Sequence, residues 1–154
     1  MWSGSIIELI DARIREILAT MPDDGGLGFS EDMDPVQYEH FCAAKLRRVG
    51  WDARVTTATG DQGVDIIAEA LGKRMVVQCK LYSSPVGNGA VQEVIAGRQF
   101  QKANFALVVS NADFTPSARQ LAQSAVVGLL HHDQLAELGR RLLLDLLQPQ
   151  EAGN

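Results

Sequence analysis

Residues 60–68 read Gly-Asp-Gln-Gly-Val-Asp-Ile-Ile-Ala, and residues 76–80 read Val-Val-Gln-Cys-Lys. Each stretch contains the alternation of a β-strand, and a Leu-Gly dipeptide between them favours a tight hairpin turn, where Gly tolerates positive φ. If the turn is centred there, Asp65 lies opposite Gln78, and Lys80 shares the face of Gln78. The sequence therefore predicts a strongly apolar hairpin on which an acid, an amide and a lysine converge.

Working outward, helix and strand signals alternate along the chain. Asp34-Pro35 is a helix start, with the aspartate as N-cap and the proline at the first helical position. Thr115-Pro116 opens another helix in the same way, and Asp133 is expected to cap the last one. The predicted helices are 35–49, 89–101, 116–124 and 134–147, and the predicted strands are 51–57, 64–70, 73–81, 103–110 and 125–131. This order, α-β-β-β-α-β-α-β-α, predicts an α/β fold with a mixed central sheet flanked by helices, its later strands parallel.

Two further segments flank this body. Residues 5–19 carry the apolar spacing of an amphipathic helix, and a Pro/Gly/Asp run follows it. We expect an N-terminal arm and linker over 1–33, a main domain over 34–147 and a frayed tail over 148–154.

Composition is that of a soluble globular protein: 154 residues, 46% hydrophobic and 21% charged. No apolar run approaches the roughly 18 residues of a membrane span, and the N-terminus lacks a secretion signal. The two cysteines, Cys42 and Cys79, lack metal-ligand spacing, so we expect them reduced and buried in a cytoplasmic protein.

The net charge of −5 is unevenly spread. Residues 1–34 hold eight acidic and two basic residues, a net of −6, so the remainder carries +1. Within 35–119 ten basic residues face seven acidic ones, a net of +3. A mildly basic body permits a polyanion such as DNA without demanding it.

Acid, amide and lysine suit metal-assisted phosphodiester hydrolysis, because Mg²⁺ takes oxygen ligands and neutralises phosphate charge. Asp65 supplies one ligand, and the backbone carbonyl of Cys79 could supply another. Glu39, on the core-facing side of its helix, would add a second carboxylate, since an acid there is costly unless it is paired or coordinating. Lys80 could then orient or deprotonate the attacking water.

The segment from Asp34 to about Leu138 resembles the catalytic domain of the Mrr-type restriction endonucleases, in the PD-(D/E)xK nuclease superfamily. The resemblance covers about two-thirds of the chain and rests on four motifs: Asp-Pro-Val-Gln-Tyr-Glu at 34–39, Gly-Asp-Gln-Gly-Val-Asp at 60–65, Gln-Cys-Lys at 78–80 and Phe-Thr-Pro-Ser-Ala at 114–118.

The resemblance implies roles for individual residues. Asp65 is the metal-binding acid, Lys80 the motif lysine, and Glu39 the helix acid near the metal. Gln78 stands where the superfamily usually has an acid, as the Mrr branch commonly shows. An amide binds Mg²⁺ less well than a carboxylate, so Glu39 or Glu69 would have to supply the missing charge.

Other signals are open to two interpretations. His131 and His132 beside Asp133 suggest a metal site, but a strand end running into a helix cap is favoured. Five further residues are candidates for DNA contacts, and for each the competing interpretation is an ordinary solvated surface: Lys45, Arg48, Tyr82, Arg98 and Lys102.

The leading hypothesis is a Mg²⁺- or Mn²⁺-dependent DNA endonuclease of restriction or defence type, with modified DNA as one option. Cutting both strands requires two sites, so we expect a homodimer or larger assembly, with target choice from loops or a specificity partner. Two alternatives stay open: a structure-selective nuclease such as a junction resolvase, and a non-catalytic DNA-binding assembly module.

Overall fold

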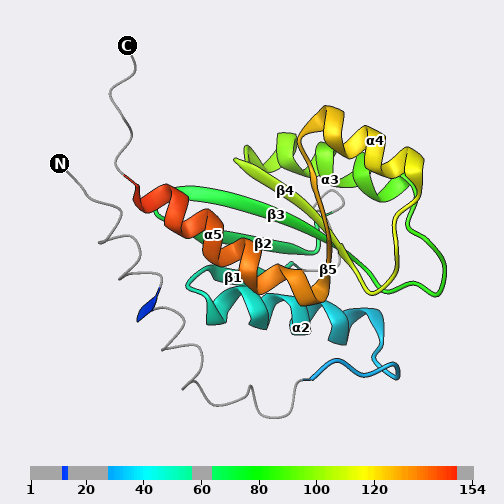
Figure 1. Ribbon diagram of the computed structural model, residues 1–154, viewed down its shortest axis with the longest axis horizontal. Helices are drawn as coiled ribbons and strands as arrows, with labels where there is room; N and C mark the ends of the chain where they lie inside the picture. The colour runs from blue at the N-terminus through cyan, green and yellow to red at the C-terminus, as the bar shows by residue number, and fades with distance from the viewer. Residues whose placement is uncertain (1–11, 14–27, 57–63, 149–154) are drawn as a thin grey trace.

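The computed structural model describes residues 12–13, 28–56 and 64–148. Five strands form one sheet in the order β1-β2-β3-β4-β5 (Figure 1). The first two pairings are antiparallel, and β3–β4 and β4–β5 are parallel. The strands are β1 (Asp52–Val55), β2 (Ile66–Ala70), β3 (Lys73–Lys80), β4 (Phe105–Ser110) and β5 (Gly128–His131). The predicted mixed sheet with parallel later strands is confirmed.

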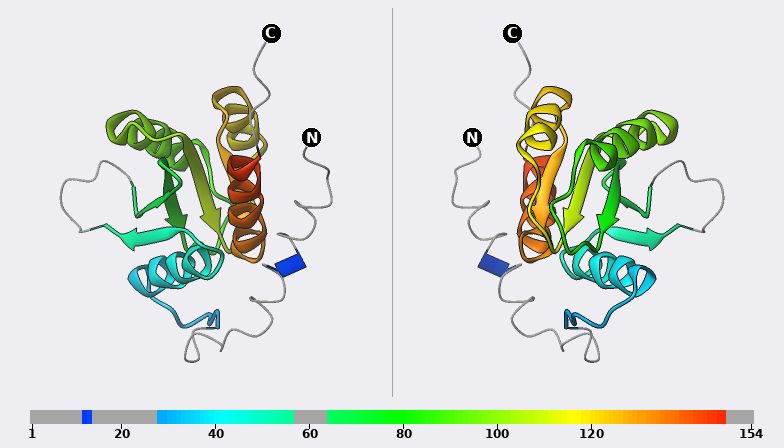
Figure 2. Two further views of the ribbon diagram at one scale, coloured as in Figure 1. Left: turned by 90° about the vertical axis from the view of Figure 1, so that its left-hand side faces the viewer. Right: turned by 90° about the vertical axis from the view of Figure 1, so that its right-hand side faces the viewer.

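Helices cover both faces of the sheet (Figure 2). They are α2 (Pro35–Arg48), α3 (Asn88–Gln101), α4 (Pro116–Ala125) and α5 (Leu135–Leu147), with the short 3₁₀ turn η1 (His132–Gln134) before α5. One apolar cluster joins the sheet to α2 and α5, and a second joins it to α3 and α4. The element order is the one that the sequence predicts.

The first described helix starts as predicted. The Asp34 carboxylate accepts the Gln37 N–H at 2.8 Å, and the Gln37 side chain accepts the Asp34 N–H at 2.9 Å. This reciprocal capping box satisfies two backbone donors that a helix start would otherwise leave open. It fixes where α2 begins, and with it the position of Glu39 one turn later.

The central strand β3 is buried on both faces, which explains its nearly continuous apolar sequence. Met75, Val77 and Cys79 belong to the cluster under α2 and α5. Val76 belongs to the cluster under α3 and α4. By the two-residue period of a strand, Gln78 therefore follows Val76 on the α3 side.

The hairpin between β2 and β3 turns at Leu71 and Gly72, with φ of 52° and 76°. Two successive positive φ values are those of a type I′ turn, whose twist matches the flanking strands. The pairing of Ile66 with Val77 follows from it, and this is the register predicted from the Leu-Gly position.

Two predictions near the C-terminus are wrong. The strand expected over 125–131 begins only at Gly128, because α4 runs through Ala125 and ends with Val126 in the left-handed region at φ 56°. Asp133 does not cap the last helix. Instead, the His131 ring accepts the Asp133 N–H and caps η1, and α5 begins at Leu135 without a side-chain cap.

Both cysteines are free and buried, as expected. Within the described ranges, no helix is long and apolar enough to cross a membrane. The predicted N-terminal helix, the loop at 60–63 and most of the tail lie outside the described residues, so the division into arm, domain and tail stays a prediction.

Candidate active site

The site forms where β2 begins beside the end of β3, and Asp65 marks the point at which regular pairing stops. The Asp65 N–H donates to the Val77 carbonyl at 2.9 Å, one residue out of step with the pairing of Ile66 and Val77. The prediction that Asp65 pairs directly with Gln78 is therefore wrong, because the regular register ends at Ile66. The Cys79 N–H then donates to the Asp65 carboxylate at 2.8 Å instead of to a backbone carbonyl. A backbone hydrogen bond thus fixes the acid at the end of the hairpin.

A second carboxylate reaches Asp65 from α2. Glu39 shares a side-chain hydrogen bond with Asp65. Burial and then the neighbouring Asp65 charge raise the pKa of Glu39 to about 7. Burial also raises the pKa of Asp65, although the Cys79 N–H, the Glu39 hydrogen bond and the Lys80 ammonium act in the opposite direction. A carboxyl group whose ionisation is opposed by burial and by a neighbouring carboxylate forms a natural cation site with that neighbour.

Glu69, the other acid that the sequence offers as a source of charge, lies elsewhere. It pairs with Arg74 at 3.6 Å near the turn end of the hairpin. The structure therefore places Glu39, and not Glu69, beside Asp65.

Gln78 and Lys80 both contact Glu93 on α3, a residue that the sequence analysis did not predict to be in the site. One Glu93 carboxylate oxygen accepts from Gln78 Nε2 at 3.0 Å and lies 3.3 Å from Lys80 Nζ. Burial lowers the pKa of Lys80, but the Glu93 carboxylate outweighs this effect and leaves the pKa above its ordinary value. Lys80 is therefore protonated, and the Glu93 carboxylate fixes the position of its ammonium group.

Topology offers a signal that could have identified Glu93. A right-handed crossover from β3 to β4 brings the start of the connecting helix back beside the carboxyl end of β3. An acid in the second turn of that helix therefore falls near the last residues of the strand. Glu93 occupies this position, 13 residues after Lys80.

The donor set fits a hard divalent cation. Among the described residues, the Gln78 Oε1 atom is buried without a hydrogen-bond partner, while its Nε2 is engaged by Glu93. Flipping the amide would turn an oxygen toward the Glu93 carboxylate, so the orientation is fixed. The two neighbouring carboxylates of Asp65 and Glu39 are oxygen ligands of the kind that Mg²⁺ prefers, and the buried Gln78 oxygen without a donor on the adjoining strand is a further oxygen of this kind. The structure shows Cys79 only as an N–H donor here, and its carbonyl as a ligand stays a prediction.

The five residues predicted to contact DNA are dispersed. Tyr82 lies beside the site, with Lys80 Nζ 5.8 Å from its ring centroid. Lys45 lies over the Phe41 ring on α2, and Arg48 follows near the end of the same helix. Arg98 donates to the carbonyls of Ala125 and Val126 and so anchors the end of α4.

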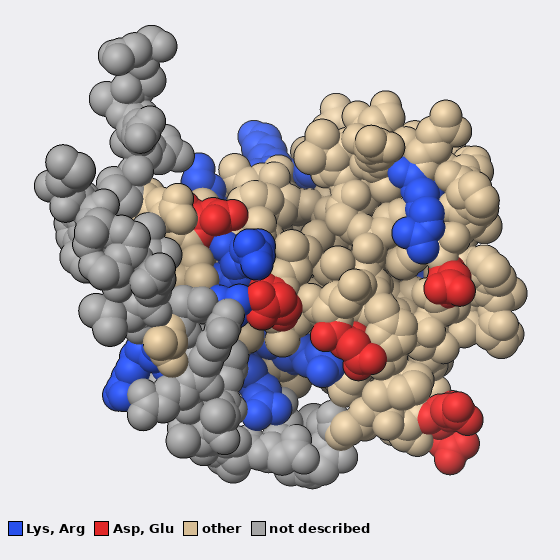
Figure 3. All heavy atoms as spheres, in the orientation of Figure 1, with Lys and Arg blue, Asp and Glu red and all other residues tan. Residues whose placement is uncertain are grey.

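Lys102, the last of the five, is exposed at the far end of α3. On the face drawn in Figure 3, described basic and acidic side chains are interspersed. A continuous basic surface is not visible on this face, and the DNA contacts stay predictions.

Residues 30–139 match the model of a restriction endonuclease family, that of the Mrr catalytic domain. The chain belongs to the Mrr-type restriction endonuclease family. The match spans more than two thirds of the chain and includes Glu39, Asp65, Gln78, Lys80 and Glu93. The resemblance inferred from the sequence motifs is thereby confirmed. No functionally curated protein is similar enough in sequence to count as a relative.

Solved structures share the fold of this Mrr-type chain. A protein of unknown function, AF1548, is 20% identical with a TM-score of 0.55, over 64% of this chain and 58% of its own. The restriction endonuclease MspJI, solved with a 27-mer oligonucleotide, is 18% identical with a TM-score of 0.52, over 96% and 35%. The DNA modification-dependent restriction endonuclease AspBHI is 16% identical with a TM-score of 0.50, over 94% and 42%. The Mrr-type chain thus spans less than two thirds of each of these proteins.

Proposed function

We propose that this chain is a Mg²⁺- or Mn²⁺-dependent DNA endonuclease that hydrolyses phosphodiester bonds at the site of Asp65. One observation carries the proposal. The Asp65 carboxylate is tied to Glu39 at the end of the hairpin where Gln78 leaves a buried carbonyl oxygen without a donor and Lys80 is held as a cation.

Asp65 and Glu39 would hold the metal with carboxylate oxygens, and Gln78 would add its amide oxygen. The Cys79 carbonyl is proposed as a further ligand. When bound, the ion supplies charge neutralisation at the phosphate and a lowered pKa of the attacking water. Glu39 would ionise fully in this state, because a cation removes the penalty that raises its pKa.

Lys80 would provide the electrostatic stabilisation that comes from a protein side chain. Its ammonium lies at the rim of the site and would stabilise the extra negative charge that phosphate acquires in the transition state. Glu93 positions both Lys80 and Gln78 through one carboxylate oxygen. In this arrangement Lys80 orients the attacking water, and Gln78 completes the ligand pocket.

DNA is the proposed substrate, supported by the restriction endonuclease family and by a neighbour whose structure contains an oligonucleotide. Modified DNA is a specific option, because AspBHI is described as modification-dependent. Each chain offers one such centre within its described residues, so double-strand cleavage would need a homodimer or larger assembly. A separate specificity partner would supply target choice.

Plasmid nicking in Mg²⁺ or Mn²⁺ tests the proposal with wild type, Asp65→Asn and Lys80→Ala. Asparagine retains an oxygen that can accept the Cys79 N–H, so the loss of activity reports the charge. Asp113→Asn and Lys73→Ala are matched controls, since both side chains are exposed and lie outside the site. We expect nicking by wild type and both controls, its loss in chelator, and its loss in both site variants.

Plasmid from methylating and non-methylating hosts, and branched against duplex oligonucleotides, distinguish the substrate classes. Robust metal-dependent cutting that survives both Asp65→Asn and Lys80→Ala would refute the assignment of the site. DNA retention without metal binding would favour the non-catalytic module.

A further inference from the structure

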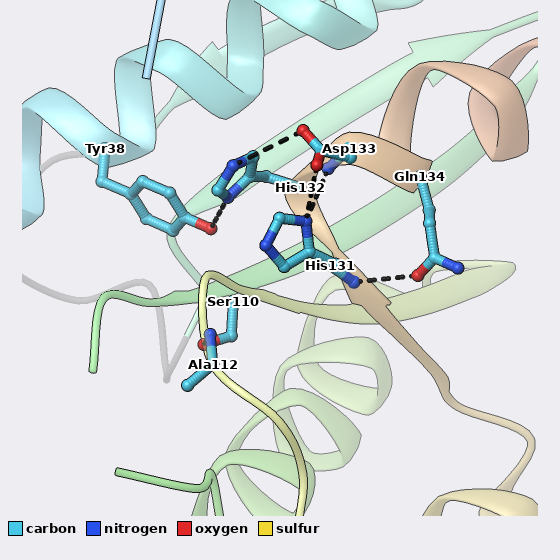
Figure 4. A network of polar contacts seen from close by, with 7 residues as sticks. All are labelled: Tyr38, Ser110, Ala112, His131, His132, Asp133 and Gln134. Atoms are coloured by element: carbon cyan, nitrogen blue, oxygen red, sulfur yellow. Dashed lines mark hydrogen bonds and ion pairs between the residues drawn. The ribbon is translucent and has the colours of Figure 1, made fainter. Parts of the chain in front are cut away.

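A second cluster of ligating side chains lies at the end of β5, outside the site of Asp65. His131, His132 and Asp133 are consecutive, and one ligand atom from each falls within 4.8 Å of the others. Figure 4 shows both rings and the carboxylate converging. Asp133 Oδ2 is 3.3 Å from His131 Nδ1, and Asp133 Oδ1 is 3.6 Å from His132 Nε2.

The His131 contact brings two acceptors together. His131 Nδ1 accepts the Asp133 N–H at 3.1 Å, so in the neutral ring it carries no proton. The Asp133 carboxylate nevertheless lies 3.3 Å from the same nitrogen. A cation that takes the place of the Asp133 N–H at Nδ1 would convert this repulsive contact into two coordinate bonds, with loss of the η1 cap.

Contacts behind the His132 ring orient its Nε2 outward. The Tyr38 hydroxyl is 3.0 Å from His132 Nδ1 in a buried contact. When the Tyr38 oxygen accepts from His132 Nδ1–H, the Nε2 lone pair is left for a ligand. Metal-binding histidines are commonly fixed by such a hydrogen bond at the second ring nitrogen.

The alternative tautomer of His132, with the proton on Nε2, lacks a good hydrogen-bond acceptor for that proton. With the proton on Nε2, the acceptor would be Asp133 Oδ1 at 3.6 Å, which is too long for a good hydrogen bond. A metal ion at Nε2 would thus select the tautomer with the proton on Nδ1, and the Tyr38 oxygen is placed to accept that proton.

The distances suit a small tetrahedral ion. Two bonds of about 2.0–2.1 Å at a tetrahedral angle separate their ligand atoms by about 3.3–3.4 Å. The distance from Asp133 Oδ2 to His131 Nδ1, 3.3 Å, matches this span, and the distance from the other oxygen, Oδ1, to His132 Nε2 is slightly longer at 3.6 Å. The ligand atoms of the two rings lie within 4.8 Å of each other, and the His131 side chain is partly exposed, which leaves it room to adjust.

An open pocket of about 740 Å³ adjoins the cluster and leaves room for a further ligand. Glu31 also lines it and offers carboxylate oxygens, whereas Asn111 Oδ1 already accepts the Tyr82 N–H at 2.8 Å. The pocket extends to Tyr82, just beyond Lys80. His131 aligns with Lys80 across β4, through the pairings of Ser110 with both. Two strand spacings, about 10 Å, thus separate their backbones.

We propose that His132, Asp133 and His131 form a binding site for a divalent transition-metal ion of the zinc class, distinct from the hard-cation site of Asp65 and Glu39. Two imidazoles with one carboxylate select zinc-like ions over Mg²⁺, whereas oxygen-only ligands do the reverse. The fourth position faces the pocket and is available to water or a small anion.

The test uses the full chain carrying Glu39→Gln and Asp65→Asn, which removes the first site. Calorimetric titration with Zn²⁺ and the visible absorption of bound Co²⁺ report the second site directly, without any nuclease readout. We expect one ion per chain. In this background Asp133→Asn and His131→Ala should each weaken binding at least tenfold. Tyr38→Phe should weaken it by about 10–100-fold, as loss of a supporting hydrogen bond does.

His40→Ala is the matched control, because His40 is the only other histidine in the sequence and is exposed on α2. It should leave the affinity for Zn²⁺ unchanged. Circular dichroism on each variant checks folding, and Asp133→Asn, at an exposed residue, decides the matter if His131→Ala is unstable. The proposal is overturned by absence of Zn²⁺ binding in the double variant, or by binding that Asp133→Asn and His131→Ala leave intact. Neither outcome affects Mg²⁺-dependent nicking by wild type, so the two proposals fail separately.

Discussion

Replacing Glu39 by glutamine should stabilise the metal-free protein at alkaline pH and leave it unchanged under acid conditions. The pKa of Glu39 is raised from 4.5 to about 7 in the folded protein, first by burial and then by Asp65. A raised carboxyl pKa means that the folded state holds the proton more tightly than the unfolded state. Relative to the glutamine variant, wild type therefore loses stability as pH rises from about 4.5 to about 7.

The size of the effect follows from the same values. A difference of 2.5 pH units between 4.5 and about 7 corresponds to at most about 3.4 kcal/mol, at 1.36 kcal/mol per unit. Glu39 is only partly buried, so solvent screening reduces this figure, and we expect about 1–2 kcal/mol. Glutamine preserves the size of the side chain, which keeps packing changes small.

Urea unfolding in chelator at pH 4 and at pH 8.5 measures the difference, with Asp145→Asn on the exposed surface of α5 as the control. At pH 8.5 Glu39→Gln should exceed wild type by about 1–2 kcal/mol, and at pH 4, below both pKa values, the two should nearly coincide. Saturating Mg²⁺ or Mn²⁺ should stabilise wild type and largely fail to stabilise the variant. A stability difference that is the same at both pH values would refute the coupling between Glu39 and Asp65.

Three further perturbations test separate parts of the structure. Glu93→Gln should lower the nicking rate by about 10–100-fold, because misplacing a reacting group by about 1 Å costs rates of this order, and it should shift the alkaline limb of the pH profile downward as Lys80 loses its carboxylate partner. An unchanged profile would contradict the positioning role. Asp34→Ala removes the capping box of α2 and should cost about 1 kcal/mol in urea unfolding, whereas Asp32→Ala, just before it, should cost much less. Leu46→Ala, in the fully buried core under α5, should cost about 2–5 kcal/mol, and a loss below 1 kcal/mol would mean that this layer packs loosely.

Local signals in the sequence predicted the elements that carry their own chemistry. Asp34-Pro35 and Thr115-Pro116 fixed two helix starts because capping depends on residues within one turn. The Leu-Gly turn fixed the hairpin register because the side-chain period of a strand is two. The register was enough to predict that Asp65 and Lys80, at the ends of the paired strands, lie close enough to interact.

Long-range contacts were less accessible to that reasoning. Glu93 joins the site through a crossover helix, so its relation to Lys80 depends on packing over 13 residues of chain. The capping role of His131 was missed because an imidazole nitrogen replaced the expected Asp133 carboxylate. The departure from regular pairing at Asp65 also follows from tertiary structure, since the side chain competes with a backbone carbonyl for the Cys79 N–H.

That last hydrogen bond makes one amide a reporter of the whole site. The Cys79 N–H lies at the end of a strand that is buried on both faces, and its acceptor is a side chain that a metal ion would also engage. Its hydrogen-exchange rate therefore measures how long the Asp65 carboxylate remains in place, while neighbouring amides of β3 report the sheet itself. Slower exchange at Cys79 alone on adding Mg²⁺ would mean that the ion locks an acid already in position, and faster exchange would mean that the carboxylate turns away from the strand to bind it.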